Sequence, residues 1–337
     1  VALTHLDISE NTPLMRLNSS ITSLDLWSFK CENCYNLIEP PYAVCEGGFS
    51  EIKQYYNDLD DGKDTMTLAT VALIGRKEAG KSTLLRSMKN GFTAFQSGDE
   101  NASKTKVFEV HDIFLQEKQC VNVIDFGGDE VYHYAYQLTF RKDCIPIVVV
   151  NMEEYENLLK KFGRREATRR VAFDWLSHFL TVAQGINQPC FIFTHCDEYR
   201  GKEGTFKKLE AEFQESMAEL SNELIKDTAK DGYSLSANLT GNTFICIGKQ
   251  GADDDYDAEL SKLRTLVLGS VKRSKCEIPT RWTEMINKDI RGNSTSSYLR
   301  FMELAAKHQK SMLQAVLGFM VRAGQILWYP VEEKRRL

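Results

Sequence analysis

One short loop constrains this chain more than any other feature. Residues Gly75–Ser82 read Gly-Arg-Lys-Glu-Ala-Gly-Lys-Ser, which fits the GxxxxGKS phosphate-binding pattern and directly follows the apolar run Leu68–Ile74. Glycines at the two ends leave backbone N–H groups free to surround phosphates, and a helix beginning near Lys81 adds the positive end of its dipole. The loop therefore predicts a strand, a tight turn and a helix that bind a nucleoside polyphosphate with Mg2+.

Within this phosphate loop, Lys81 is expected to reach the terminal phosphates and the Ser82 hydroxyl to enter the Mg2+ shell. The alternative is a chance match in an ordinary strand-to-helix turn. Leu84, Leu85 and Met88 follow at helical spacing, which favours the phosphate site. The residues that we expect at the nucleotide here are Gly75, Lys77, Glu78, Ala79, Gly80, Lys81, Ser82 and Thr83.

From Thr67 onward, apolar runs alternate with amphipathic ones, as in βα units on a mostly parallel sheet. The short interval Gln116–Gln119 separates two of these runs and predicts an antiparallel hairpin at one edge. We therefore predict an α/β fold with the six-stranded, mostly parallel sheet of a Ras-like P-loop GTPase. The predicted strands are Leu68–Ile74, Val107–Leu115, Cys120–Asp125, Cys144–Asn151, Cys190–Thr194 and Thr243–Ile247.

The N-terminal segment carries a repeat pattern. Residues 3–11 match the LxxLxLxxN core of a leucine-rich repeat, and a weaker second register follows at Ile21, Leu24 and Leu26. Repeat units cannot bury their apolar faces alone, so two degraded copies predict the end of a longer array. A lone strand and turn with fortuitous leucines is the alternative.

Two stretches have the composition of connectors. Residues 30–60 contain paired prolines and glycines, with one short helix predicted at Phe49–Leu59, and Gly269–Pro279 is the second stretch. From Arg281 onward the chain is expected to be mostly helical, with an apolar stripe. The stripe consists of Met312, Leu313, Val316, Leu317, Met320 and Val321.

Composition limits the partners and the compartment. The net charge of −5 gives no basis for a nucleic-acid partner, and the basic run Lys160–Arg170 is interleaved as on a solvated helix face. Polar residues interrupt the longest apolar stretch, Met312–Tyr329, so no transmembrane segment is expected. Nine scattered cysteines indicate a reducing, cytoplasmic compartment. Cys31 and Cys34 leave half of a zinc site open as an interpretation, although no second pair follows at finger spacing.

A second motif falls at the carboxyl end of a predicted strand, where open α/β sheets bind ligands. Asp125 would hold a water on Mg2+, and Gly128, which ends the sequence Asp-Phe-Gly-Gly, would bind the γ-phosphate through its N–H and move when that phosphate leaves. Protein kinases also carry Asp-Phe-Gly, but this chain has no His-Arg-Asp segment.

Thr194, His195 and Asp197 belong to a segment that looks like a base-reading motif. The Asp197 carboxylate would accept two hydrogen bonds from guanine, whereas adenine presents no matching pair of donors. The alternative is a surface acid after a buried strand. Gly248 and Lys249, after the last predicted strand, fit a loop that closes over guanine, although this pattern is short and degenerate.

Thr105 lies in the polar stretch Gln96–Lys106, which is long enough for a mobile switch loop. Its hydroxyl would complete the Mg2+ shell when GTP is bound, and Thr93, Ser97 and Ser103 compete for that role. Together these motifs predict GTP or GDP with Mg2+. The predicted metal ligands are Ser82, Thr105 and Asp125.

At these residues the chain resembles the Roco proteins, in which a Roc (Ras of complex proteins) GTPase domain follows leucine-rich repeats and precedes a COR domain. The resemblance rests on the Thr-His-x-Asp base motif, on Thr105–Val110 and on Asp125–Gly128. Residues 26–47 look like the linker into a Roc domain, and Ile278–Trp282 and Phe319–Tyr329 look like the opening of COR.

The resemblance implies three parts, namely the end of the repeats with a linker at 1–48, a Roc domain at 49–272 and the N-terminal part of COR at 273–337. It also implies a signalling switch that couples nucleotide state to a COR-mediated homodimer or to a neighbouring domain, in some members a serine/threonine kinase. No kinase signature lies in this chain, which begins with Val1 rather than Met, so we expect it to be part of a longer protein. Effectors are not indicated.

Two departures from Ras-type sequences bear on hydrolysis. Asp129 stands where such GTPases carry a glutamine that orients the attacking water, and its charge would repel the γ-phosphate. Lys77 stands where their loops keep a glycine, and Arg76 and Arg141 are candidates for an arginine finger that cannot be assigned. We expect slow hydrolysis; a scaffold that holds nucleotide without turnover is the competing interpretation, and a P-loop ATPase is the third. The candidate catalytic residues are Lys81, Thr105 and Asp129.

Overall fold

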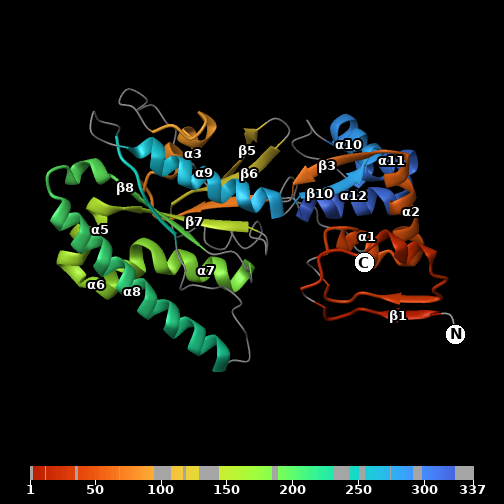
Figure 1. Cartoon of the computed structure of the whole chain (residues 1–337), viewed down its shortest axis with the longest axis horizontal. Helices are drawn as coiled ribbons and strands as arrows, with labels where there is room; N and C mark the ends of the chain where they lie inside the picture. Colours follow the sequence, from red (N-terminus) through yellow and green to blue (C-terminus); the bar gives the residue numbers. More distant parts are fainter. Residues whose placement is uncertain are drawn as a thin grey trace. The chain divides into compact units, whose positions relative to one another are not determined.

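The chain forms two compact units, one of residues Ala69–Arg273 and one of Val1–Leu68 with Ser274–Leu337 (Figure 1). The predicted site residues, from Gly75 to Lys249, all belong to the first unit. The computed structural model describes residues 3–11, 13–34, 37–67, 69–94, 108–116, 119–128, 144–183, 189–230, 243–249, 255–273, 275–290 and 298–322.

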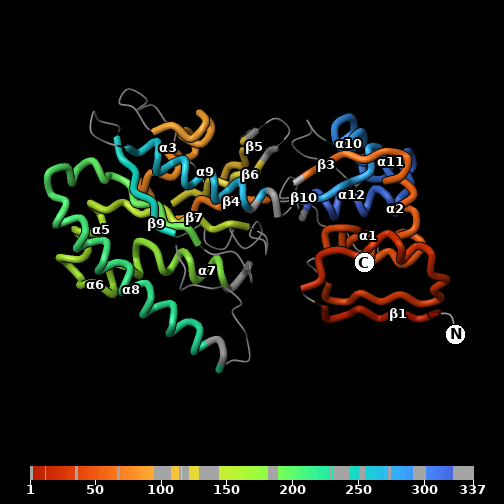
Figure 2. The backbone as a smooth tube through the Cα atoms, in the orientation of Figure 1, coloured from red at the N-terminus to blue at the C-terminus, as the bar shows by residue number. Residues whose placement is uncertain are grey.

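A six-stranded sheet forms the centre of the first unit, in the spatial order β5-β6-β4-β7-β8-β9. Figure 2 labels β4, β5, β6, β7 and β9 on the backbone tube. β5 and β6 pair antiparallel as an edge hairpin, and the other neighbouring pairs are parallel. This confirms the predicted mostly parallel sheet and its hairpin. The strands are β4 (Thr70–Ile74), β5 (Phe108–Gln116), β6 (Gln119–Phe126), β7 (Cys144–Asn151), β8 (Cys190–Thr194) and β9 (Thr243–Cys246).

Helices cover both faces of this sheet because alternate residues of a buried strand point to opposite sides. In β4, Val71 and Leu73 belong to the core of one face, and Ala72 and Ile74 to the core of the other. The first face carries α3 (Lys81–Lys89) and α9 (Tyr256–Arg273), and the second carries α5 (Met152–Phe162), α6 (Arg164–Thr168), a π-helical turn (Arg169–Phe173), α7 (Asp174–Ala183) and α8 (Glu203–Lys230) (Figure 1).

The basic run of the sequence extends from the end of α5 through α6 into the π-helical turn, and its arginines on α6 are paired on the surface. Arg164 contacts Glu215 and Glu219 of α8, the latter at 2.7 Å, and Arg165 contacts Glu223 one turn further along α8. These charges are neutralised within the unit, as expected for a solvated helix face.

In the second unit, β1 (His5–Asp7) and β2 (Ser28–Lys30) pair in parallel with His5 opposite Ser28. Hydrogen bonds from Glu32 to Ser9 and from Asn33 to Glu10 join the turns that follow the two strands, with the same offset of 23 residues. The second register predicted at Ile21, Leu24 and Leu26 is therefore wrong, because a 3-10 turn (Ser19–Ser23) lengthens the segment between the strands. The pairing instead equates Leu26, Phe29, Cys31 and Cys34 with Leu3, Leu6, Ile8 and Asn11.

Cys31 and Cys34 thus occupy interior positions of this register. Cys34 is fully buried, and its Sγ donates to the carbonyl oxygen of Ile8 at 2.9 Å. Cys31 is hydrogen-bonded to the thiol of Cys45 in the same core. Among the described residues, no group of three or more histidine, cysteine, aspartate or glutamate side chains is placed to hold a metal ion.

Both stretches predicted as connectors are packed elements. The first contains two helices, and the second is wrong as a connector because α9 runs to Arg273 and β10 (Lys275–Pro279) pairs antiparallel with β3 (Lys63–Thr67). The predicted helix Phe49–Leu59 is confirmed as α2 (Phe49–Asp61). The other helices of this unit are α1 (Tyr42–Glu46), α10 (Thr280–Met285), a π-helical turn (Ile286–Ile290), α11 (Tyr298–His308) and α12 (Lys310–Arg322).

The helices of the second unit share one apolar core, and α2 belongs to it. The first unit therefore begins only after α2 and β3. Ile52 and Tyr55 of α2 are buried together with Trp282 of α10 and with Leu313 and Val316 of the predicted stripe on α12. Residues 49–68, which the prediction assigned to the GTPase domain, therefore pack with the C-terminal segment, and the sheet-containing unit begins at Ala69. In the described part of the chain, no helix has both the length and the apolar character needed to cross a membrane.

Candidate functional site

The phosphate loop joins β4 to α3 as a tight turn that requires glycine at both ends. Gly75 and Gly80 have φ values of +137° and +97°, which other residues adopt only with strain. A Cβ on Gly75 would lie 2.4 Å from the carbonyl oxygen of Val149 on the neighbouring strand. Gly80 directly precedes the first residue of α3, so the N–H groups of the first turn of that helix begin at the loop.

The Lys81 ammonium lies within the loop. Its Nζ donates to the carbonyl oxygens of Gly75 at 2.8 Å and Arg76 at 2.6 Å, and the residue is 6% exposed. A buried cation needs such acceptors because it has lost its water. The turn therefore surrounds a positive charge, an arrangement that suits an anionic ligand.

Ser82 and Asp125 meet across the sheet edge. The Ser82 hydroxyl donates to Asp125 Oδ2 at 2.7 Å, and Asp125, near the end of β6, is 1% exposed. Hydroxyl and carboxylate oxygens are the donors that Mg2+ prefers, so this pair fits the predicted metal. Thr105, the third predicted ligand, lies outside the described residues, as do Asp129 and Arg141.

Gly128 packs directly against the phosphate loop. The Lys77 N–H donates to the Gly128 carbonyl oxygen at 3.1 Å. A Cβ on Gly128 would lie 2.2 Å from the Lys77 nitrogen, so a larger residue has no room there. In this conformation a backbone amide of the phosphate loop is engaged by the residue that we predicted to sense the γ-phosphate.

An ion pair ties the phosphate loop to α5, which the motifs did not indicate. Arg76 Nε lies 2.8 Å from Glu154 Oε1. The start of α5 is fixed by Asn151, whose Oδ1 accepts hydrogen bonds from the N–H groups of Glu153 and Glu154 at 3.0 and 3.2 Å. No sequence signal marks the Arg76–Glu154 contact, because only the sheet order brings its two segments together.

The base motif follows β8 and is anchored to the phosphate loop. Thr194 Oγ1 donates to the carbonyl oxygen of Ala79 at 2.8 Å, and Thr194 is buried. His195 has a φ of +60°, which turns the chain sharply before Asp197. The phosphate loop and the start of the base motif are therefore one connected structure.

Backbone contacts join the base motif to the loop after β9. The Cys196 N–H donates to the Ile247 carbonyl oxygen at 3.2 Å, and the Ile247 N–H donates to the Phe193 carbonyl oxygen at 2.8 Å. The Arg200 guanidinium also donates to the carbonyl oxygen of Lys249. These bonds fix the position of Gly248 beside Asp197.

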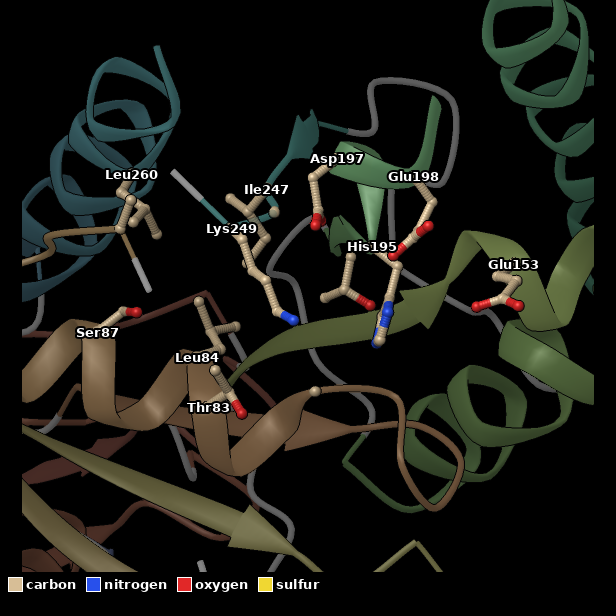
Figure 3. A pocket seen from close by; sticks show the side chains of 14 residues that line it. Thr83, Leu84, Ser87, Glu153, His195, Asp197, Glu198, Ile247, Lys249 and Leu260 are labelled. Carbon is tan, nitrogen blue, oxygen red and sulfur yellow. The ribbon is translucent and has the colours of Figure 1, made fainter. Parts of the chain in front are cut away.

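The three segments enclose one cavity of about 380 Å³. Figure 3 shows the Lys249 side chain reaching over α3, with His195, Glu198 and Glu153 along the opposite wall. Of the predicted residues, Gly80, Thr83, Thr194, His195, Asp197, Gly248 and Lys249 line this cavity. Its other lining residues are Leu84, Ser87, Ala94, Glu153, Glu198, Ile247 and Leu260.

The remaining predicted residues that the structure describes lie in the phosphate loop or next to it and do not line the cavity. Glu78 adopts a φ of +62° within the loop, and Ala79 is buried there. Gly75, Lys77, Lys81, Ser82, Asp125 and Gly128 are held by the contacts given above. The cavity and the phosphate loop meet at Gly80, because this residue lines the cavity and also ends the turn of the phosphate loop.

Comparison with known proteins gives distant relatives. No protein-family model matches the chain. Over 205 residues it is 27% identical to the malignant fibrous histiocytoma-amplified sequence 1 homolog of Xenopus tropicalis, and over 205 residues 24% identical to the probable serine/threonine-protein kinase pats1 of Dictyostelium discoideum. These alignments cover 59% and 55% of this chain but 19% and 6% of those proteins, so the chain spans less than a fifth of either relative.

A solved structure resembles the chain more extensively. Roco2 RocCORdC of Methanosarcina barkeri, determined bound to GDP, aligns with a TM-score of 0.50 and 20% sequence identity, over 80% of this chain and 71% of that one. At this level of identity the likeness concerns the fold. The chain therefore has a Roco-like fold, with a six-stranded, mostly parallel sheet in its first unit.

Proposed function

We propose that this chain binds guanine nucleotide with Mg2+ and acts as a regulatory switch with slow GTP hydrolysis. The observation that carries the proposal is the cavity on which Gly80, Asp197 and Lys249 converge from three segments. The Roco-like fold supports it, since the similar Methanosarcina protein was determined bound to GDP.

In this proposal the base lies at the end of the cavity formed by Asp197, Gly248 and Lys249. The Asp197 carboxylate accepts the ring N–H and the exocyclic amine of guanine, and Gly248 leaves the space for that carboxylate. Thr194 and His195 hold the motif in place, and the stem of Lys249 covers the base.

The phosphates lie along the phosphate loop. Lys81 exchanges the carbonyl oxygens of Gly75 and Arg76 for phosphate oxygens, and the N–H groups at the start of α3 donate to the same anion. Ser82 and Asp125 would hold Mg2+, with Thr105 as the third protein ligand. The bound ion would neutralise charge on the phosphate oxygens.

Switching would use the contact between Lys77 and Gly128. A γ-phosphate near the loop competes for the Lys77 N–H that now donates to Gly128, so its arrival displaces Gly128. Asp129 follows Gly128 directly, and its negative charge next to the γ-phosphate disfavours rapid attack by water. Binding is thus coupled to movement of the segment after β6, while hydrolysis stays slow.

The architecture that we propose assigns Ala69–Arg273 to a Roc domain and the segment from Ser274 onward to the start of COR. Residues 1–48 are assigned to the end of leucine-rich repeats and a linker, because β1 and β2 pair in parallel and Asn11 Nδ2 donates to the Ile8 carbonyl oxygen at 2.7 Å. We further propose that the protein is cytoplasmic and dimerises through COR. It would be part of a longer chain, which in some relatives includes a kinase.

The nature of the copurifying nucleotide tests the proposal first. Chain purified without added nucleotide is denatured, and the released nucleotide is identified by ion-exchange chromatography. We expect GDP or GTP, and none from Lys81→Ala, which lacks the loop cation. Copurification of ADP would refute the assignment to guanine nucleotide.

A scaffold that holds nucleotide without turnover is the second candidate, favoured by Asp129 and by the bulk of Lys77. A single-turnover assay with γ-labelled GTP separates the two functions. Phosphate release that is lost in Ser82→Ala supports the hydrolase. Tight binding without release supports the scaffold.

A further inference from the structure

Two cysteines meet between the loops that form the base end of the cavity. Cys196 begins the turn Cys196–Tyr199 after β8, and Cys246 is the last residue of β9. Their thiol groups are joined by a hydrogen bond, and both cysteines are free. Neither residue has a role in the nucleotide site proposed above.

The sheet holds this pair together independently of the thiols. β8 and β9 are parallel neighbours with Phe193 opposite Cys246. The turn after β8 then folds back, so that the Cys196 N–H reaches the carbonyl oxygen of Ile247, the residue after Cys246, at 3.2 Å. Cys196 Sγ also donates to the Phe193 carbonyl oxygen at 3.3 Å. The strand pairing and the folded turn therefore hold the two cysteines beside each other in space.

The two thiols differ in accessibility. Cys196 is 8% exposed, whereas Cys246 is half-buried at the end of an edge strand. The pKa of Cys196 is raised, first by its hydrogen bond with Cys246 and then by burial, so Cys196 stays protonated at neutral pH. A soluble oxidant therefore meets Cys246 first.

We propose that Cys196 and Cys246 form a peroxide-sensitive disulfide that weakens nucleotide binding in this cavity. The sulfur of Cys246 attacks hydrogen peroxide, the O–O bond breaks, and a sulfenic acid forms while the departing hydroxide takes the proton of the thiol to become water. The sulfur of Cys196 then attacks the sulfenic sulfur, its proton passes to the leaving hydroxyl, and a second water departs. Two thiols and one peroxide thus give one disulfide and two waters.

The effect on the cavity follows from the tight packing of the two loops. Asp197 is the next residue after Cys196, and a Cβ on Gly248 would already lie 2.7 Å from the Asp197 backbone nitrogen. A bond of about 2.05 Å between the sulfurs pulls the loops closer and shifts Asp197 against Gly248. By linkage, bound nucleotide disfavours the disulfide to the same extent. This effect rests on the proposed function, whereas formation of the disulfide does not.

The experiment uses the full chain with hydrogen peroxide as the oxidant. Non-reducing peptide mapping by mass spectrometry reports the linked peptide, and titration with fluorescent GDP reports affinity before oxidation, after it, and after treatment with dithiothreitol. We expect a Cys196–Cys246 linkage and affinity reduced at least about fivefold, the lower end of typical coupling between sites, with full recovery on reduction. Cys246→Ser and, as a second variant, Cys196→Ala should lose the response to peroxide.

Cys45→Ala is the matched control, because it removes the other hydrogen-bonded thiol pair, Cys31–Cys45, from a different core. It should keep the full response. The inference is overturned if reduced protein binds GDP but peroxide gives no Cys196–Cys246 peptide, or if the loss of affinity persists in Cys246→Ser. If the reduced protein fails to bind GDP, the proposed function is refuted instead. Peptide mapping would still show whether Cys196 and Cys246 form a disulfide.

Discussion

Gly248 and Asp197 are packed so closely that Gly248 has no room for a side chain. A Cβ at Gly248 would lie 2.5 Å from Asp197 Oδ1 and 2.7 Å from the Asp197 backbone nitrogen. Both values are shorter than any stable non-bonded contact, and one of the two involves backbone, which cannot rotate away. The position of the Asp197 carboxylate therefore depends on a glycine in a different segment.

Gly248→Ala should accordingly weaken nucleotide binding through displacement of Asp197. Loss of hydrogen bonds to a charged group costs about 1.5–3 kcal/mol, so we expect affinity for fluorescent GDP to fall roughly ten- to hundredfold. Gly204→Ala is the matched control, since no atom lies within 4 Å of a Cβ at that helical glycine. Equal affinities for the two variants would show that Asp197 does not read the base.

Arg76 is expected to contribute little to hydrolysis. Its guanidinium is held on Glu154, and both side chains are about one-third exposed, at 32% and 29%, so the pair is worth up to about 1 kcal/mol in stability. Arg76→Ala should change the single-turnover rate of GTP hydrolysis less than about threefold, far below the thousandfold effect of an arginine finger. Glu154→Gln, which releases Arg76, serves as the comparison. A hundredfold slower reaction in Arg76→Ala would mean that Arg76 leaves Glu154 to act on the transition state.

Asp289 should stabilise the second unit in a pH-dependent way. Its carboxylate accepts Lys307 Nζ at 2.8 and 3.0 Å and contacts His308 Nε2 at 2.7 Å. The pKa of Asp289 is lowered, first by Lys307 and further by His308. Because the folded-state pKa is depressed, this stabilisation is present above the ordinary aspartate value of about 3.9 and is lost as the pH falls through the folded-state pKa.

Asp289→Asn should therefore lower the free energy of unfolding by about 1–3 kcal/mol at pH 7, and this difference should shrink as the pH falls below about 4. Urea unfolding followed by circular dichroism at several pH values measures it. Glu284→Gln, in an exposed pair with Lys288, should cost less than about 0.5 kcal/mol at any pH. A deficit in Asp289→Asn that does not change with pH would contradict the ionic origin.

The core of the first unit could be predicted because its signals are local. Apolar runs bounded by turn residues predicted β7 and β8 with the same bounds as in the structure. The glycines of the phosphate loop marked a turn, and their positive φ values explain why glycine is needed there. The spacing of Leu84, Leu85 and Met88 likewise predicted the buried face of α3. Each of these features depends on residues that lie next to one another in the chain.

Features that depend on distant segments were missed. The pairing of β3 with β10 joins residues 63–67 to residues 275–279, and no local pattern distinguishes such edge strands from connectors. The short helix α1 was hidden by Pro41 and Gly47, which here stand at its start and its end. The Arg76–Glu154 pair and the wall residue Leu260 were missed because only the fold brings them to the site.

The central claim is that Asp197 makes this cavity specific for guanine. It is tested by titrating the chain and its Asp197→Asn variant with GDP, xanthosine diphosphate and ADP, all with Mg2+, by isothermal calorimetry. The account predicts that the wild-type chain prefers GDP over ADP by about 10⁴-fold or more, as buried polar recognition allows, and that Asp197→Asn prefers the xanthine nucleotide. Comparable affinity for ADP and GDP, with no change of preference in Asp197→Asn, would contradict it.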